Sequence, residues 1–383
     1  MLRRTHLPER VLAGVMVLAA TASAAAQCQT VAQRLAPITA RLESETMRIL
    51  HDTGIPAISI ALVLNGDVVW ADAYGLANVA EHVPATAETY FSTGSTLKPV
   101  TAGAIMQLVD SGKLSLDEPL NAIVGPTLAI AGADDVTLRH MLAHYSGLDG
   151  PMEIVPLWGR QSLKTPEETL AETHRVGEPG VHYEYCNVCY SAAGYVIEQT
   201  SGLSFDEYLA TRIFAPLGVE TTTPTRPTPQ VVEHLALPYG SENGVTVPID
   251  QIRTNVFAAG DAYLRPKDMA AFLAGVLNLG TYRGHRILSE ASAAELMRPQ
   301  FGSDDAGLGF NIDRLEGRTV VTKNGIFTGY HTHMMGDPET RDGVYVAANS
   351  TQAGRVAARL AQLALRLLWG EDPPPLASFG PGG

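Results

Sequence analysis

The sequence has 383 residues, of which 45% are hydrophobic and 17% are charged, and this composition excludes a globally disordered chain. Its formal net charge of -13 comes from scattered Asp and Glu without a long acidic run, which indicates a solvated surface. The chain has no cluster of Lys and Arg that would displace counterions from phosphates, which argues against nucleic-acid binding.

The first residues have the pattern of a secretory signal. Three arginines precede the apolar run at 11–20, and small residues follow it up to Ala26. The run is shorter than the roughly 20 residues that span a bilayer, so we expect no stable membrane anchor. Residues 1–26 are therefore predicted to be a signal peptide that is cleaved near Ala26, and the rest of the chain is expected to be periplasmic or secreted.

Helical spacing at 30–52 is followed by two β-strands around Asn65-Gly66, a strong hairpin signal. Helices and long loops are predicted between about 95 and 290. The end returns to strands, "GLGFNIDRL", "RTVVTKN", "YHTHMMGD" and "GVYVAANS", followed by the amphipathic run "RVAARLAQLALRLLWG".

These elements predict a single domain over 27–383. Isolated hairpins at the two ends cannot bury a sheet face alone, so we expect both ends to share one sheet. The fold class is α/β (α+β): an antiparallel sheet from residues 27–94 and 291–383, flanked by the first and last helices. A mostly helical subdomain of residues 95–290 is inserted, and a ligand cleft is expected where the two parts meet.

Three cysteines occur, Cys28, Cys186 and Cys189. The "CNVC" spacing could indicate a redox motif or half a zinc site, but no second Cys pair or nearby His cluster would complete four ligands. Packing or a structural bridge between Cys186 and Cys189 is the better interpretation, and the odd count leaves at least one thiol unpaired within the chain.

A serine and a lysine lie one turn apart in "STLKPV", where a helix is predicted to begin at Ser95. A partly desolvated lysine with a lowered pKa can help to remove the proton of a serine hydroxyl, and a helix N-terminus offers N–H groups to an oxyanion. A serine at a helix start is also a common N-cap, so Ser95 and Lys98 alone do not decide between the two.

Two further motifs follow in the chain. Tyr185 and Asn187 flank Cys186, and a phenol beside a lysine ammonium is expected to become more acidic and to relay protons. Lys323 lies on a late strand, where its positive charge at a strand edge could hold a substrate carboxylate. Gly325, two residues later, would let a ligand lie close against that strand.

In this order the motifs resemble the serine β-lactamase and penicillin-binding protein superfamily, within it the class C-like group that includes D,D-carboxypeptidases, D-aminopeptidases and esterases. The resemblance runs from about residue 50 to residue 350. It includes "RHMLAHYSGLDG" at 139–150, "SGKLSLDEPL" after the nucleophile helix and "IFAPLGVETT" at 213–222.

The resemblance implies that Ser95 is the acylated nucleophile, that Lys98 keeps its proton mobile and that Tyr185 relays protons. It implies substrate contacts by the segment 323–326 and by the amide of Asn187. Within that segment, the resemblance places Lys323 near the substrate carboxylate, with Asn324 and Gly325 beside it. The backbone N–H groups of Ser95 and Ile326 would form the oxyanion hole.

Two residues depart from the family pattern. Asn324 stands where the penicillin-directed members carry Thr or Ser, so a hydroxyl contact to the substrate carboxylate is missing. This weakens the expectation of efficient β-lactam hydrolysis. Cys186 stands where small residues such as Ser or Ala are common.

The sequence thus predicts an exported serine hydrolase that acts through an acyl-enzyme on an amide, lactam or ester carbonyl. A β-lactamase-like or D,D-carboxypeptidase-like activity is favoured, on a small molecule or peptide that can carry a free carboxylate. An esterase, a D-aminopeptidase and a non-hydrolytic penicillin-binding sensor remain as alternatives, because the cleft loops decide the substrate. No metal or organic cofactor is implied.

Overall fold

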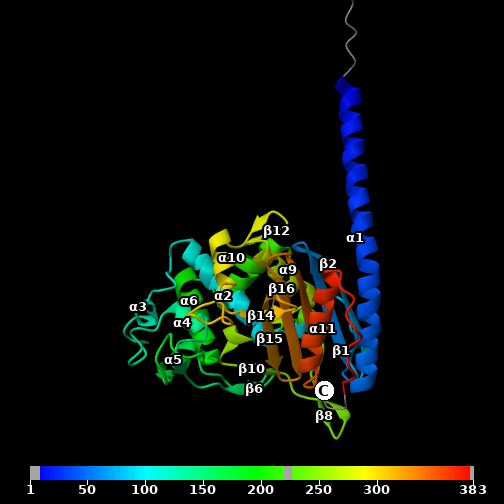
Figure 1. Ribbon diagram of the computed structural model, residues 1–383. Coiled ribbons are helices and arrows are strands. Elements are labelled where there is room, and N and C mark those ends of the chain that lie inside the picture. The colour runs from blue at the N-terminus through cyan, green and yellow to red at the C-terminus, as the bar shows by residue number, and fades with distance from the viewer. Residues whose placement is uncertain (1–8, 220–226, 380–383) are drawn as a thin grey trace, which may run out of the picture. The chain divides into compact units, whose positions relative to one another are not determined.

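The computed structural model describes residues 9–219 and 227–379, and for residues 9–30 it describes the backbone only. The chain divides into two compact units, Met1–Glu45 and Thr46–Gly383. The first unit holds most of helix α1 (Glu9–Thr53), which confirms the helix predicted from residue 30 onward (Figure 1). No described helix is long and apolar enough to cross a membrane. The predicted signal peptide lies partly outside the described residues, and its cleavage near Ala26 stays a prediction.

The second unit is built on a seven-stranded antiparallel sheet that takes strands from both ends of the chain, as predicted. The strand order is β14-β15-β16-β17-β1-β2-β3. Strand β1 joins the two halves, because it pairs with β2 through the Asn65-Gly66 turn and with β17 from the other end. The bounds are β1 (Ala57–Leu64), β2 (Asp67–Asn78), β3 (Val83–Pro84), β14 (Asn311–Leu315), β15 (Arg318–Phe327), β16 (Tyr330–Asp337) and β17 (Asp342–Ala348).

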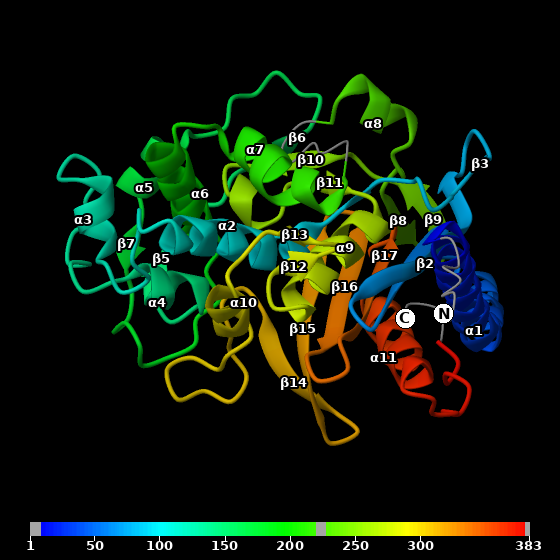
Figure 2. The same cartoon turned by 90° about the horizontal axis from the view of Figure 1, so that it is seen from above.

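Two helices cover the two faces of this sheet (Figure 2). Helix α11 (Gly354–Leu368), the predicted amphipathic run, packs on β16 and β17 through its buried apolar side. Helix α9 (Pro266–Leu277) packs on β17, β1 and β2, where Gly336 and Gly343 leave room for its leucines. Strand β1 is buried along its whole length, so this layer is the core of the unit.

Helices are the main secondary structure of the stretch 95–290, as predicted, but short two-stranded ladders that no sequence pattern had indicated lie in it and directly before it. Each ladder strand has two to four residues, too short for a period of two to appear. The ladders pair β4 (Phe91–Ser92) with β11 (Tyr263–Leu264), β5 (Leu148–Asp149) with β7 (His174–Arg175), β6 (Ile154–Pro156) with β10 (Ile252–Thr254), β8 (Tyr239–Glu242) with β9 (Val245–Pro248) and β12 (Thr281–Tyr282) with β13 (His285–Arg286).

Helix α2 (Lys98–Asp110) of this stretch is buried over nearly all of its length. The others are α3 (Leu120–Val124), α4 (Leu138–Leu142), α5 (Pro166–Ala171), α6 (Asn187–Ser201), α7 (Phe205–Tyr208), α8 (Pro229–Glu233) and α10 (Glu290–Leu296), with the short turns η1 (Gly94–Leu97), η2 (Leu209–Phe214), η3 (Ala215–Leu217) and η4 (Phe257–Ala259). Helix α2 packs against α6, α10 and the turn η2. Helix α9 comes from the same stretch but covers the sheet, so the predicted division at residue 290 stays a prediction.

The turn η1, which carries Ser95, is fastened to the face of the sheet. The carbonyl oxygen of Thr93 accepts hydrogen bonds from the hydroxyls of Thr332 at 2.6 Å and Thr96 at 2.7 Å. Thr96 also lies 2.7 Å from the hydroxyl of Tyr345 on β17. The sheet thus fixes the backbone just before Ser95.

Gly325 on β15 is where the strand and this turn come closest. A Cβ there would lie 2.3 Å from the carbonyl oxygen of Thr93 and 2.2 Å from Oγ1 of Thr332. On the side where a Cβ would stand, Gly325 therefore makes room for the segment that carries Ser95, and the expectation that it lets a ligand lie close against the strand stays a prediction.

Gly325→Ala is expected to displace this turn and to lower hydrolysis of a reporter ester by about 10²-fold or more, since a shift of about 1 Å at a reacting group has that effect. The matched control is Gly317→Ala in the β14–β15 hairpin, where an added Cβ meets no atom within 4 Å but φ is +80°. That variant should lose about 1 kcal/mol of stability in thermal unfolding and keep its turnover. Equal turnover in the two variants would contradict the role of Gly325.

Candidate active site

Ser95 and Lys98 lie on consecutive turns, but the helix begins later than predicted. Ser95 belongs to the 3-10 turn η1, and α2 begins at Lys98, with Pro99 in its first turn as expected. Gly94, before Ser95, has a φ of +51°, which favours glycine. The sharp turn directs the Ser95 hydroxyl at Lys98, and Nζ lies 3.0 Å from Oγ.

Lys98 is fully buried and its amino group contacts three oxygen atoms. Besides Ser95 Oγ, Nζ lies 2.9 Å from Oδ1 of Asn187 and 2.9 Å from the carbonyl oxygen of Ala259 in η4. Burial lowers the pKa of Lys98 well below its usual value, as predicted, and the charge of Lys323 lowers it further.

These contacts decide where the lone pair of a neutral Lys98 points. A neutral amine has two N–H bonds and one lone pair, whereas a carbonyl or amide oxygen only accepts hydrogen bonds. The two hydrogens therefore go to Asn187 and Ala259, and the lone pair is left facing the hydroxyl of Ser95. This arrangement can accept the proton of Ser95 as it attacks a carbonyl.

Tyr185 donates a hydrogen bond of 2.6 Å to Ser95 Oγ, opposite to the role expected of an acidic phenol. Partial burial raises the pKa of Tyr185 to about 12, against the hydrogen bond to Ser95, which lowers it, although 48% of the residue is exposed. The prediction that nearby lysines make this phenol more acidic is therefore wrong, because partial burial shifts its pKa in the opposite direction. Both lysines do lie beside the ring, with Nζ of Lys98 at 4.8 Å and of Lys323 at 5.2 Å from its centroid.

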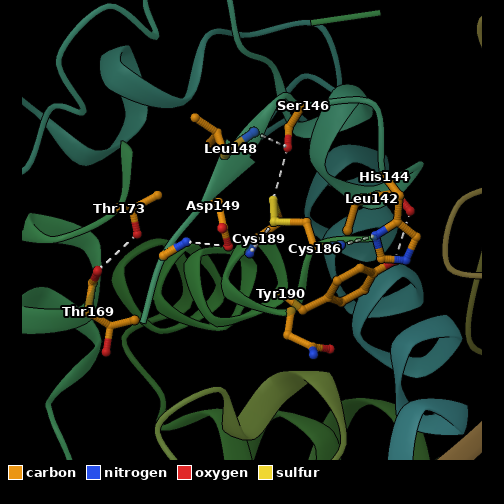
Figure 3. The surroundings of a disulfide bond; sticks show 12 residues. Leu142, His144, Ser146, Leu148, Asp149, Thr169, Thr173, Cys186, Cys189 and Tyr190 are labelled. Carbon is orange, nitrogen blue, oxygen red and sulfur yellow. Dashed lines mark hydrogen bonds between the residues drawn. A yellow bond between two sulfur atoms is a disulfide. The ribbon is translucent and has the colours of Figure 1, made fainter. Parts of the chain in front are cut away.

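Cys186 and Cys189 form a disulfide at the start of α6, which confirms the structural bridge (Figure 3). Sγ of Cys186 also accepts the backbone N–H of Cys189 at 3.1 Å, and Sγ of Cys189 lies 3.1 Å from the hydroxyl of Ser146. The bridge therefore closes the first helical turn around Asn187 and lies directly after Tyr185.

His144 packs against the segment that carries Tyr185 and Cys186. Its Nδ1 accepts the backbone N–H of Cys186 at 3.1 Å, and its ring lies 4.5 Å from the ring of Tyr185. Burial lowers the pKa of His144 well below its usual value, and the nearby lysine charges lower it further, so the ring is neutral. His144 thus fixes Tyr185 and does not supply a charge.

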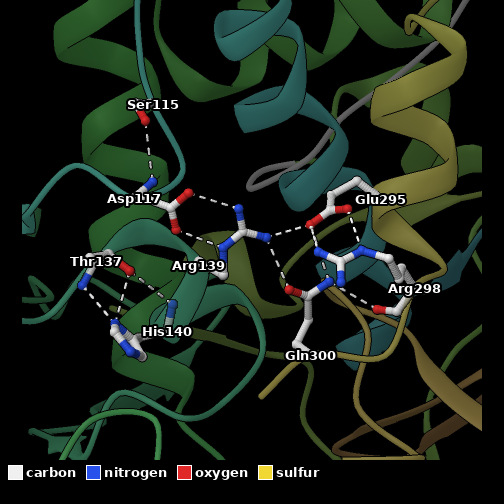
Figure 4. A network of polar contacts seen from close by, with 8 residues as sticks. All are labelled: Ser115, Asp117, Thr137, Arg139, His140, Glu295, Arg298 and Gln300. Atoms are coloured by element: carbon white, nitrogen blue, oxygen red, sulfur yellow. Dashed lines mark hydrogen bonds and ion pairs between the residues drawn. The ribbon is translucent and has the colours of Figure 1, made fainter. Parts of the chain in front are cut away.

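The loop that carries His144 begins at a network of ion pairs around Arg139 (Figure 4). The guanidinium of Arg139 binds both carboxylate oxygens of Asp117, at 2.7 and 2.9 Å, and also contacts Glu295 of α10 and Gln300. Bidentate pairing of this kind fixes direction as well as distance. The segment 139–150 is therefore held at its start, in α4, by α10, and β5 near its end packs against α6.

Lys323 lies within the sheet and not at its edge, because β15 pairs with both β14 and β16. Its side chain is 3% exposed, and Nζ lies 3.4 Å from Oδ1 of Asn311. Burial lowers the pKa of Lys323 to about 8, so its charge is not permanent, in contrast to the expectation. Near pH 7 it can still act as a cation.

Six of the eight predicted residues line one cleft of about 410 Å³, and Lys98 and Gly325 are not among its lining residues. Ile326 borders it, and a Cβ on Gly94 would lie 2.9 Å from the backbone nitrogen of Ile326, so the two segments expected to form an oxyanion hole are adjacent. Tyr183 and Asn311 also line the cleft and had not been singled out, since no local motif marks them. The lining residues are Ser95, Tyr183, Tyr185, Asn187, Asn311, Lys323, Asn324 and Ile326.

The family is shown by comparison with known proteins. Residues 30–368 match the Beta-lactamase family. The chain belongs to this family. The chain is 31% identical to penicillin-binding protein 4 of Amycolatopsis lactamdurans over 64% of its own length and 66% of that protein. It is 26% identical to a D-aminopeptidase of Gluconobacter oxydans over 83% of its own length and 60% of that protein. The chain thus spans less than two thirds of the length of each of these two relatives.

The fold is likewise that of solved relatives. The octameric penicillin-binding protein homologue from Pyrococcus abyssi superposes with a TM-score of 0.72, at 28% identity, over 87% of this chain and 78% of that one. The family resemblance and the fold class given by the sequence motifs are confirmed.

Removal of the disulfide should affect the site more than the fold. The double variant Cys186→Ser, Cys189→Ala keeps an oxygen to accept the N–H of residue 189, and a loop this short contributes at most about 2 kcal/mol to stability. Because the bridge encloses Asn187 beside Tyr185, we expect acylation of the variant by a reactive probe to be slower.

The measurement is stopped-flow acylation together with thermal unfolding, and treatment of the native protein with a phosphine reductant should reproduce the effect. Cys28→Ser is the control that removes a thiol outside the bridge. Unchanged acylation after verified reduction would contradict a positioning role for the bridge.

Proposed function

We propose that the protein hydrolyses an amide, lactam or ester bond through an acyl-enzyme on Ser95. The observation that carries the proposal is the chain of contacts from the Tyr185 hydroxyl to Ser95 Oγ and on to Lys98 Nζ, at 2.6 and 3.0 Å. Neutral Lys98 is the general base, because its pKa is lowered and its lone pair faces Ser95. Tyr185 keeps its proton at neutral pH and donates it.

The reaction then follows from these groups. Ser95 Oγ attacks the carbonyl carbon while its proton passes to Lys98. The backbone N–H groups of Ser95 and Ile326 receive the oxyanion. When the bond to the leaving group breaks, Tyr185 donates its proton to that group and is left as a tyrosinate, while Lys98 keeps the proton of Ser95, because the acylated Oγ cannot carry one. Water then attacks the acyl-enzyme and gives a proton to the tyrosinate, and Lys98 returns its proton to Ser95 Oγ as the acid is released.

For the substrate we propose a small molecule or peptide with a free carboxylate beside the scissile bond. Lys323 is a cation buried in the wall of the cleft, where a charge-assisted hydrogen bond contributes about 1.5–3 kcal/mol. Lactams and peptides with a C-terminal D-amino acid satisfy this description. Asn324 offers an amide in place of a hydroxyl, which supports a modest preference for such ligands.

A second candidate is a D-aminopeptidase or esterase activity, favoured by the similarity to the Gluconobacter oxydans D-aminopeptidase over 83% of the chain. A penicillin-binding sensor that acylates without turnover is a third. The exported location predicted from residues 1–26 remains part of the proposal.

The nucleophile is tested by mass spectrometry after incubation with a reactive β-lactam or a fluorophosphonate. We expect one adduct, on Ser95, and we expect Ser95→Ala to abolish both the adduct and turnover. Thr96→Ser in the same turn is the control, because it keeps the hydroxyl that contacts Tyr345. An adduct that persists in Ser95→Ala would place the nucleophile elsewhere.

Carboxylate recognition is tested with matched free-acid and methyl-ester substrates. In the native protein kcat/KM should favour the acid, and the preference should fall as pH rises through about 8, because Lys323 loses its charge there. Lys323→Ala should remove most of the preference, a change of about tenfold or more for a contact of 1.5 kcal/mol. If the substitution slows both substrates equally, an esterase activity becomes the better proposal.

A further inference from the structure

Asp261 is a buried carboxylate beside the catalytic turn, and it plays no part in the reaction described above. Its residue is 3% exposed and directly follows η4 and Gly260. The neighbouring backbone holds both ends of the catalytic segment: Ala259 accepts from Lys98 Nζ, and Ala262 accepts the N–H of Thr93 at 2.8 Å. Asp261 therefore lies in the chain segment that holds the general base, Lys98, in place.

A small cavity connects Asp261 with the reacting group. It has a volume of about 50 Å³, and Ser95, Asn187 and Asp261 are among its lining residues. No other acidic residue among those described lines this cavity or the larger cleft. Thr254 fixes the carboxylate, since its backbone N–H donates to Asp261 at 2.6 Å and its hydroxyl at 2.9 Å.

Asp261 and Lys98 each shift the pKa of the other. Burial raises the pKa of Asp261 to about 7, against the hydrogen bonds from Thr254 and the charge of Lys98, which lower it. The carboxylate in turn raises the pKa of Lys98, against burial and the charge of Lys323. Lys98 thus experiences one cation and one anion, both within the buried part of the site.

We propose that Asp261 is a positioning residue for acyl transfer, whose carboxylate stabilises the ammonium that Lys98 becomes when it takes the proton of Ser95. The step itself rests on the proposed function, whereas the charge interaction does not. Loss of the carboxylate would leave Lys98 neutral down to a lower pH but would make it a weaker base, so acylation would begin at lower pH and reach a slower plateau.

Other ionisable groups lie near Asp261 and Lys98, and substitution of Asp261 does not remove them. Tyr185, Tyr190 and His144 are uncharged at neutral pH, because burial shifts each pKa toward the neutral form. The groups that face Lys98 are Lys323 on β15, Tyr185 just before α6, Tyr190 on α6, and His144 after α4. The groups that face Asp261 are Arg253 on β10 and Tyr263 on β11.

The test is the titration midpoint of Lys98, measured by NMR on protein with ¹³C-labelled lysine, which has only five signals to resolve. Lys98→Met assigns the signal. In Asp261→Asn the midpoint should fall by about one pH unit or more, as expected when an opposite charge nearby is removed. The pH dependence of Ser95 labelling by a fluorophosphonate should shift the same way, with a slower plateau.

Asp268→Asn is the matched control, because Asp268 is another buried carboxylate of the same stretch but pairs with Arg265. It should leave the Lys98 midpoint unchanged even if it lowers stability. Should Asp261→Asn fail to fold, Thr254→Val removes one hydrogen bond to the carboxylate and should shift the midpoint in the same direction by less.

An unchanged Lys98 midpoint in folded Asp261→Asn would overturn the proposal, whatever happens to turnover. Absence of Ser95 labelling in the native protein, with the midpoint shifted as expected, would overturn the proposed function and leave the charge interaction standing. The two results are separate measurements, so one failure does not imply the other.

Discussion

The three hydrogen bonds of the Lys98 amino group are the constraint on which the site depends. A buried amine in a close-packed interior must satisfy its donors, and here two oxygens that can only accept take two hydrogens. One comes from α6 and the other from η4, so the orientation of the lone pair requires both elements in place. The disulfide holds the start of α6, and the hydroxyl of Thr101 on α2 donates to the carbonyl oxygen of Ala258 in η4 at 2.7 Å.

The sheet carries the other half of the arrangement. The turn before Ser95 is bound to β16 and β17 by Thr332 and Tyr345, which come from the far end of the chain. Ser95 and Lys323 are thus brought together by contacts between residues that lie 239 and 249 positions apart in the sequence.

Much of the fold followed from the sequence, because long strands and amphipathic helices leave periodic patterns. The hairpin at Asn65-Gly66 and the four late strands were predicted, while ladders of two residues left no pattern. Among site residues, Ser95, Lys98, Tyr185 and Lys323 could be named from their motifs. Asp261 could not, because its importance arises from a neighbour distant in sequence. The shift of the Tyr185 pKa was predicted in the wrong direction, because the motif shows which charges are nearby but not how far the side chain is buried.

The burial of the two lysines has a consequence for the stability of the whole protein. In the unfolded chain each lysine would titrate normally, whereas in the native state the pKa of Lys98 is lowered and that of Lys323 is about 8. For Lys323 the unfolded state therefore binds more protons between about pH 8 and 10.5, and unfolding becomes less favourable as pH rises through this range. Each unit by which a pKa is lowered weakens the fold by about 1.4 kcal/mol at pH values below both pKa values. The two buried amines thus lower the free energy of unfolding of the native protein, and a chain without them would be more stable.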